Sequence, residues 1–141
     1  MAIVSLTRRV RFAAAHRYRR PEWDDRRNDE VFGLCARPQY HGHTYTCDVT
    51  VAGEIDAVTG MILDLRLLDD ALRHEVIDRF DHRNINVEVP EFADGKLVPT
   101  GENLARFIFE RVQGVLGTQA RVTEVRVAED DTLSATYRAN S

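Results

Sequence analysis

The stretch Cys35-Ala-Arg-Pro-Gln-Tyr-His41-Gly-His43 places one thiol and two imidazoles within nine residues, at the start of a strongly alternating segment. Side chains two positions apart on an extended strand point the same way, so His41 and His43 aim at a common point while Gly42 leaves room beside them. Two aligned imidazoles supply half of a tetrahedral zinc site, and catalytic zinc typically takes three protein ligands and keeps one position open. A third ligand is therefore expected elsewhere in the chain.

Two alternating segments predict the strands that carry these ligands. From His41 to Val51 the histidines share the apolar side, and residues 4–16 alternate in the same way and end their apolar side on His16. Because imidazoles buried without partners cost free energy, three of them on the apolar sides of two strands predict a metal site. His16, His41 and His43 form a nitrogen-only ligand set, which favours zinc but does not exclude other divalent ions.

The rest of the chain predicts an α+β fold. Asp64 can cap a helix over residues 65–80, and Thr100 can cap a second helix that ends near Gly114 or Gly117. Residues 123–129 and 133–137 alternate around two aspartates, which predicts a β-hairpin. We therefore expect the order ββααββ, with a four-stranded antiparallel sheet and two helices on one face. Residues 17–40 show no clean periodicity and are expected to form a long loop.

Length and charge narrow the class of protein. The 141 residues fit a single domain over 1–141, and the formal charge of −4 argues against nucleic-acid binding. Apolar runs fall well short of the ~20 residues that span a bilayer, and the N-terminus lacks the pattern of a secretion signal, so we expect a cytoplasmic protein without membrane contact. Residues 8–27 nevertheless carry a local charge of +5, which suits a small polyanion.

Other polar residues suggest acid–base chemistry. Cys47 lies among apolar neighbours and is interpreted as a core residue, whereas Cys35 lies in a loop, where a lowered pKa would make its thiolate reactive. His82, held by Asp81, can act as a base for that thiol, or it can simply cap the preceding helix. Glu129 ends the apolar side of a strand, which favours either an amino-substituted heterocycle as its partner or an ordinary turn-flanking acid.

Seven segments in register resemble one family, that of the 6-pyruvoyltetrahydropterin and 6-carboxytetrahydropterin synthases, and the match runs over almost the whole chain. The segments are Phe12-Ala-Ala-Ala-His16, Cys35-x5-His41-Gly-His43, Gly53-Glu-Ile-Asp-Ala-Val-Thr-Gly-Met61, Leu72 through Asp81-His82, Val89-Pro-x-Phe-Ala-Asp94, Thr100-x-Glu-Asn103 and Val127-Ala-Glu129. The resemblance implies the tunnelling fold, in which three ββααββ subunits close a barrel and two trimers stack into a homohexamer with active sites between subunits.

The resemblance also implies roles for individual residues. It makes His16, His41 and His43 zinc ligands, Cys35 the general base, and Asp81 and His82 its proton relay. Glu129 would anchor a pterin ring, with Glu102 and Thr100 lining the pocket. Between these last two stands Gly101, where eukaryotic members often have a second threonine, so part of the ring contacts departs from the family pattern.

The implied function is that of a zinc-dependent lyase that converts 7,8-dihydroneopterin triphosphate to 6-pyruvoyltetrahydropterin and eliminates triphosphate, as in tetrahydrobiopterin biosynthesis. Arg17, Arg19 and Arg20 follow a ligand directly and are our candidates for binding the triphosphate. One alternative is 6-carboxytetrahydropterin synthase, on the queuosine route. The five residues between Cys35 and His41 favour the pyruvoyl branch, since a spacing of three residues is common in the carboxy branch. A second alternative is a zinc- or pterin-binding module without catalysis.

Overall fold

The computed structural model describes residues 2–140 and is organised around two long strands. β1 (Ile3–His16) and β2 (His41–Glu54) pair antiparallel over their full length, in a register that sets His16 opposite His41. β4 (Arg121–Ala128) pairs with β2, and β5 (Ser134–Arg138) pairs with β4, both antiparallel. The expected strands and the C-terminal hairpin are confirmed, and the pairing of β1 with β2 brings three histidines to one end of the sheet.

The sheet has a fifth strand that the sequence pattern does not predict. β3 (Arg83–Asn84) pairs parallel with β1 at Ala14 and Ala15, which gives the order β3-β1-β2-β4-β5. The expected antiparallel four-stranded sheet is therefore the greater part of a mixed five-stranded sheet. A strand of two residues is too short to show alternation, and only its contact with β1 defines it.

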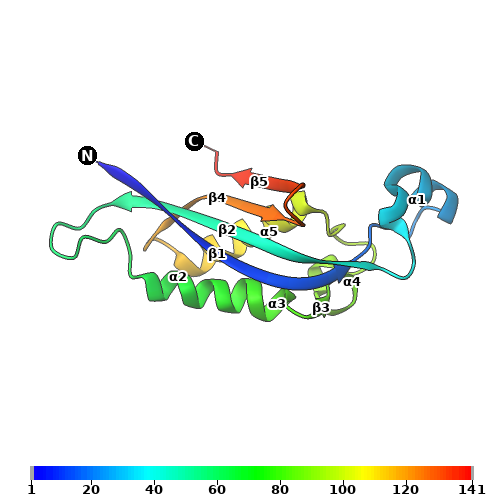
Figure 1. Cartoon of the computed structure of the whole chain (residues 1–141), viewed down its shortest axis with the longest axis horizontal. Coiled ribbons are helices and arrows are strands. Elements are labelled where there is room, and N and C mark those ends of the chain that lie inside the picture. Colours follow the sequence, from blue (N-terminus) through cyan, green and yellow to red (C-terminus); the bar gives the residue numbers. More distant parts are fainter. Residues whose placement is uncertain (1, 141) are drawn as a thin grey trace.

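The helices cover one face of the sheet, as expected (Figure 1). α2 (Leu65–Leu72) and α3 (Asp78–Phe80) are joined by a π-helical turn over Arg73–Ile77, so the predicted helix over 65–80 is continuous. α5 (Gly101–Leu116) begins after Thr100, whose side chain accepts a hydrogen bond from the amide of Asn103. The short α4 (Ile85–Glu88) and the 3-10 turn Pro90–Phe92 lie between them in sequence.

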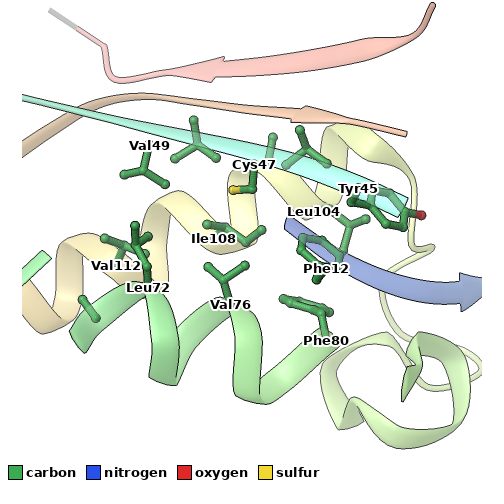
Figure 2. Close-up of a cluster of buried hydrophobic side chains, with 14 of the residues drawn as sticks. Phe12, Tyr45, Cys47, Val49, Leu72, Val76, Phe80, Leu104, Ile108 and Val112 are labelled. Atoms are coloured by element: carbon green, nitrogen blue, oxygen red, sulfur yellow. The ribbon is translucent and has the colours of Figure 1, made fainter. Parts of the chain in front are cut away.

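The core lies between the strands and these helices, as Figure 2 shows. Phe12 stacks on Tyr45 with ring centroids 4.8 Å apart and on Phe80 at 5.4 Å. Cys47 is fully buried in this cluster, which confirms it as a core residue, and burial raises the pKa of its thiol to about 12. The aromatic layer leads directly to the histidine end of the sheet, because Phe12 and Tyr45 stand on the same side of their strands as His16 and His43.

Residues 17–40 do not form the continuous long loop that the sequence predicted. They contain α1 (Asp25–Phe32) and a 3-10 turn over Gly33–Ala36, and α1 projects beyond the end of the long β1–β2 ribbon (Figure 1). Asp24 caps α1 by accepting from the amide of Arg27 at 2.8 Å. The Asp24 cap and the hydrogen bonds of the buried Asn28 hold this segment in place. Such contacts leave no periodic signal in the sequence of a short, charged helix.

None of the helices among residues 2–140 is both long and apolar enough to cross a lipid bilayer.

A buried carboxylate joins α5 to the π-helical turn. Glu75 accepts hydrogen bonds from Arg111 at 3.0 Å and from Arg79 at 3.3 Å, and its side chain is only 8% exposed. Burial raises the pKa of Glu75, but the hydrogen bonds from the two arginines lower it by more, so the net pKa lies below its ordinary value. The ionised carboxylate therefore stabilises the fold.

We expect Glu75→Gln to lower the free energy of unfolding by about 1.5–3 kcal/mol, the usual value of hydrogen bonds to charged groups. Because the folded-state pKa is depressed, this stabilisation is present above the unfolded value of roughly 4.3 and is lost as the pH falls through the folded pKa. Urea titrations at several pH values measure both effects. The matched control is Glu110→Gln, which removes an exposed partner of Arg106 and should cost under about 0.5 kcal/mol. Equal losses in the two variants would contradict this account.

Candidate metal centre and active site

Three histidines converge where β1 and β2 end. One ligating nitrogen from each of His16, His41 and His43 lies within 4.8 Å of the other two, and the ring centroids are 4.6–5.2 Å apart. Three nitrogens that each lie about 2.1 Å from one tetrahedral ion are about 3.4 Å apart. The three nitrogens would therefore have to approach one another by up to about 1.4 Å for all of them to bind one metal ion.

The protein orients one of these ligands through its main chain. His16 is fully buried, and its Nδ1 lies 2.7 Å from the carbonyl oxygen of Pro99. A carbonyl only accepts hydrogen bonds, so Nδ1 carries the proton. The lone pair of Nε2, which the Tyr45 hydroxyl approaches to 3.3 Å, is the one available to a metal, the arrangement common around metal-binding histidines. Burial lowers the pKa of His16 to about 4, and the two neighbouring imidazoles add to that effect. The ring is therefore neutral at pH 7, as metal binding requires.

A second ligand has an unsatisfied nitrogen. Within the described residues, Nε2 of His43 is buried and has no hydrogen-bond partner. The nearest carboxylate oxygen is Oε2 of Glu129, at 3.8 Å. Buried polar atoms are rarely left unpaired, and one that is calls for an explanation such as a missing ion. This nitrogen, the neutral His16 and the nitrogen-only donor set together fit a divalent metal ion.

Cys35 lies close to this centre but outside the cluster. It occupies the 3-10 turn Gly33–Ala36, and its carbonyl accepts a hydrogen bond of 2.7 Å from the amide of Tyr18. Burial raises the pKa of the Cys35 thiol, and the negative charge of Glu129 raises it further. In the isolated chain, therefore, the thiol is held in its protonated form, and a nearby cation is needed to favour the thiolate.

Asp81 and His82 lie at the edge of β1 that faces away from β2. The Asp81 carboxylate accepts from the amide of Ala13 at 2.9 Å and lies 3.0 Å from Nδ1 of His82, whose own amide donates to the carbonyl of Ala13. His82 adopts a left-handed backbone conformation with φ of 60°, and its side chain is 84% exposed. Asp81 thus orients His82, but no contact joins either residue to Cys35 in the part of the chain that the structure describes.

A small cavity of about 40 Å³ lies beside the histidines. Glu129 and Glu102 both line it, together with Tyr18, Gly101 and Ser134. Thr100 instead serves as the cap of α5, and it is not among the residues that line this cavity. A side chain at Gly101 would place its Cβ 3.4 Å from that of Ala135, so a threonine there would narrow the cavity.

The three candidate arginines have different surroundings. Arg19 pairs with Asp25 at 3.0 Å, and Arg20 pairs with Glu22 at 2.6 Å. Arg17 stacks its guanidinium 5.1 Å from the ring centre of Tyr40, and its buried Nε has no hydrogen-bond partner within residues 2–140. Of the three candidates, Arg17 therefore has the most unused capacity to bind an anion.

Sequence reasoning missed three contributors to the site. The Tyr45 hydroxyl lies 3.0 Å from Nδ1 of His16, the Tyr18 hydroxyl donates to Oε1 of Glu129 at 3.2 Å, and Pro99 supplies the carbonyl that orients His16. Tyr45 shares the side of β2 that carries His43, so strand parity was a usable signal for it, whereas Tyr18 lies beyond the end of β1. The Pro99 contact bridges 83 residues and has no local signal.

Comparisons with known proteins identify the family. Residues 5–140 match the family model described as 6-pyruvoyl tetrahydropterin synthase. The chain belongs to this family. It is 38% identical over 133 residues to the 6-pyruvoyl tetrahydrobiopterin synthase of Homo sapiens. This match covers 94% of this chain and 90% of that protein.

Two further relatives bear on the family assignment. The structure of the Caenorhabditis elegans 6-pyruvoyl tetrahydropterin synthase superposes with a TM-score of 0.92 at 34% identity, and the match covers 99% of this chain and 98% of that one. The 6-carboxy-5,6,7,8-tetrahydropterin synthase of Bacillus subtilis is 32% identical over 113 residues, which is 77% of this chain and 73% of that protein. The superposition on the Caenorhabditis elegans structure over nearly the whole of both chains confirms the predicted α+β fold class.

Proposed function

We propose that the protein is a zinc-dependent lyase that converts 7,8-dihydroneopterin triphosphate to 6-pyruvoyltetrahydropterin and inorganic triphosphate. The observation that carries this proposal is the convergence of three histidine nitrogens, one of them unpartnered, beside a cavity lined by Glu129 and Glu102. The 38% identity to synthases named for this product supports it. The conversion is an internal redox isomerisation with elimination of triphosphate, so it consumes no external reductant.

His16, His41 and His43 would hold the zinc ion, which favours such a nitrogen set and leaves a fourth position open to substrate. When bound, zinc supplies Lewis acidity, polarising side-chain oxygens of the substrate and making the neighbouring carbon-bound proton easier to remove. The protein's own contribution is to keep the ligands neutral and oriented. The Pro99 carbonyl does this for His16, and burial lowers the pKa of His41.

The remaining residues would bind the ring and move the proton. The Glu129 carboxylate can accept two parallel N–H groups from the amino-substituted ring, while Cys35 removes the side-chain proton as a thiolate. Asp81 would orient His82 so that its exposed imidazole completes the proton relay. The cationic surroundings that a thiolate needs would come from the nearby metal and from His82.

We infer that this relay is completed between subunits of a homohexamer, a dimer of trimers. In one chain, Cys35 lies near Glu129, while Asp81 and His82 lie on the far side of β1, against Ala13. The cavity of about 40 Å³ that Glu129 and Glu102 line within one chain is also far below the ~300 Å³ at which ligand pockets typically begin. A neighbouring copy that brings its own His82 to Cys35 would supply both the missing relay and the missing wall.

The test is to incubate the zinc-loaded protein with 7,8-dihydroneopterin triphosphate without oxygen and to identify the products by mass spectrometry. A 6-pyruvoyl product with released triphosphate supports the proposal. A 6-carboxy product with acetaldehyde would place the protein on the queuosine route instead. Binding of the substrate without turnover, in protein that retains zinc and its native assembly, would favour a non-catalytic pterin-binding module.

Arg17 is the proposed partner of the triphosphate. We expect Arg17→Gln to raise KM for the triphosphate substrate by about ten-fold or more, since a hydrogen bond to a charged group contributes roughly 1.5–3 kcal/mol. Arg19→Gln is the matched control, because the guanidinium of Arg19 is already paired with Asp25, and its KM should change little. Steady-state kinetics of the two variants decide the matter, and an unchanged KM in Arg17→Gln would rule out this role.

A further inference from the structure

The phenol of Tyr18 contacts the carboxylate that the proposed function assigns to ring binding. Its hydroxyl donates to Oε1 of Glu129 at 3.2 Å, and both side chains line the same cavity. The Tyr18 ring packs edge-on against His16, with centroids 5.2 Å apart, and against Phe32 at 5.9 Å. The phenol is therefore held between His16, a candidate metal ligand, and Phe32, at the end of α1.

The main chain on both sides of Tyr18 is fixed by two buried asparagines. Asn86 accepts from the amide of Arg17 and donates to the carbonyl of the same residue, at 2.8 and 3.0 Å. Asn28 does the same for Arg20, at 2.8 and 3.1 Å. The amide of Tyr18 itself donates to Cys35. Functional groups need such support to keep a productive geometry, and here the support fixes the position of a single hydroxyl.

The Glu129 carboxylate lies close enough to the metal centre to bind the metal instead of a substrate, so something must hold it away. Its Oε1 lies 3.8 Å from Nε2 of His16, and its Oε2 lies 3.8 Å from Nε2 of His43. Neighbouring ligands of a tetrahedral zinc ion lie about 3.4 Å apart, so a small shift would let this carboxylate become a fourth ligand. A carboxylate in that position would close the open site and would no longer present both oxygens to a ring.

We propose that Tyr18 is a positioning residue that holds the Glu129 carboxylate toward the substrate ring and away from the metal. This inference rests on the proposed function, because it assigns Glu129 to the ring. The Tyr18 hydroxyl takes one lone pair of Oε1 and leaves the other, together with Oε2, for the parallel N–H donors of a 2-amino-4-oxo heterocycle. Tyr18 thereby determines selectivity for the 2-amino group without touching the reacting atoms.

The test compares two ligands that differ only at ring position 2. Neopterin carries the 2-amino group, and its lumazine counterpart carries an oxygen there, which an anchoring carboxylate rejects. Dissociation constants for both are measured by fluorescence on the zinc-loaded protein, its Tyr18→Phe variant and a Tyr137→Phe control. Tyr137, on β5, packs its ring against Phe109 of α5, and its substitution makes the same chemical change. Zinc content and unfolding midpoint are recorded for each protein.

We expect Tyr18→Phe to bind neopterin about ten-fold more weakly, in line with one hydrogen bond to a carboxylate, and to bind the lumazine as before. The preference for the amino ring then falls about ten-fold while zinc content stays constant. Equal losses for both ligands would mean that Tyr18 only supports the local structure, and unchanged constants would mean that it has no role; either overturns the inference. A wild-type protein that does not prefer neopterin would instead refute the role of Glu129 in the proposed function.

Discussion

Cys35→Ala abolishes turnover of 7,8-dihydroneopterin triphosphate and leaves the metal in place; this is the result we expect. A positioned general base contributes typically 10²–10⁴-fold, so turnover should fall by at least about that factor. Metal content should stay the same, because the cluster of potential ligands comprises His16, His41 and His43 and does not include Cys35. Steady-state kinetics and elemental analysis of the purified variant measure the two effects.

The matched control is Cys47→Ala, which removes the other thiol. Cys47 is fully buried in the core, so this variant should keep its turnover and lose stability, as small truncations in a packed core do. Loss of metal from Cys35→Ala would make Cys35 a fourth ligand and would overturn its assignment as the base. If Cys35→Ala retained its turnover, removal of the substrate proton would have to be assigned to another group.

His43→Ala is expected to have an equally large effect, on the metal itself. Loss of a hydrogen-bond partner behind a ligand typically costs 10–100-fold in metal affinity, so loss of a ligand should cost more than about 100-fold. Turnover should disappear with the metal. Competition titration with a zinc chelator measures the affinity, and unfolding with and without zinc measures the stabilisation that binding confers.

The metal-free state sharpens this prediction. Nε2 of His43 is buried and unpartnered, and an unsatisfied buried polar atom costs about 1–3 kcal/mol. Removing it should offset much of the lost packing, so the metal-free variant should be about as stable as the metal-free wild type, and zinc should no longer raise its unfolding midpoint. His74→Ala is the control, because its side chain is 63% exposed beside Asp78. A His43→Ala protein that still gains stability from zinc would contradict the ligand assignment.

The sequence by itself determined the elements whose signal is periodic. Alternation in residues 4–16 and from His41 onward predicted β1 and β2, and the parity of His16, His41 and His43 predicted that they would face one point. Helical spacing and the caps at Asp64 and Thr100 predicted α2–α3 and α5. These patterns are local, because burial on one face imposes its period on every long strand or helix.

Only the tertiary structure decided how the site is assembled around these elements. It separated Asp81 and His82 from Cys35, defined β3 through its contact with β1, and formed α1 where no period was visible. It also brought the Tyr18 hydroxyl to Glu129, across 111 residues. Hydrogen bonds between distant segments depend on how whole elements pack, so the positions of single polar atoms are set by the fold and leave no trace in the local pattern.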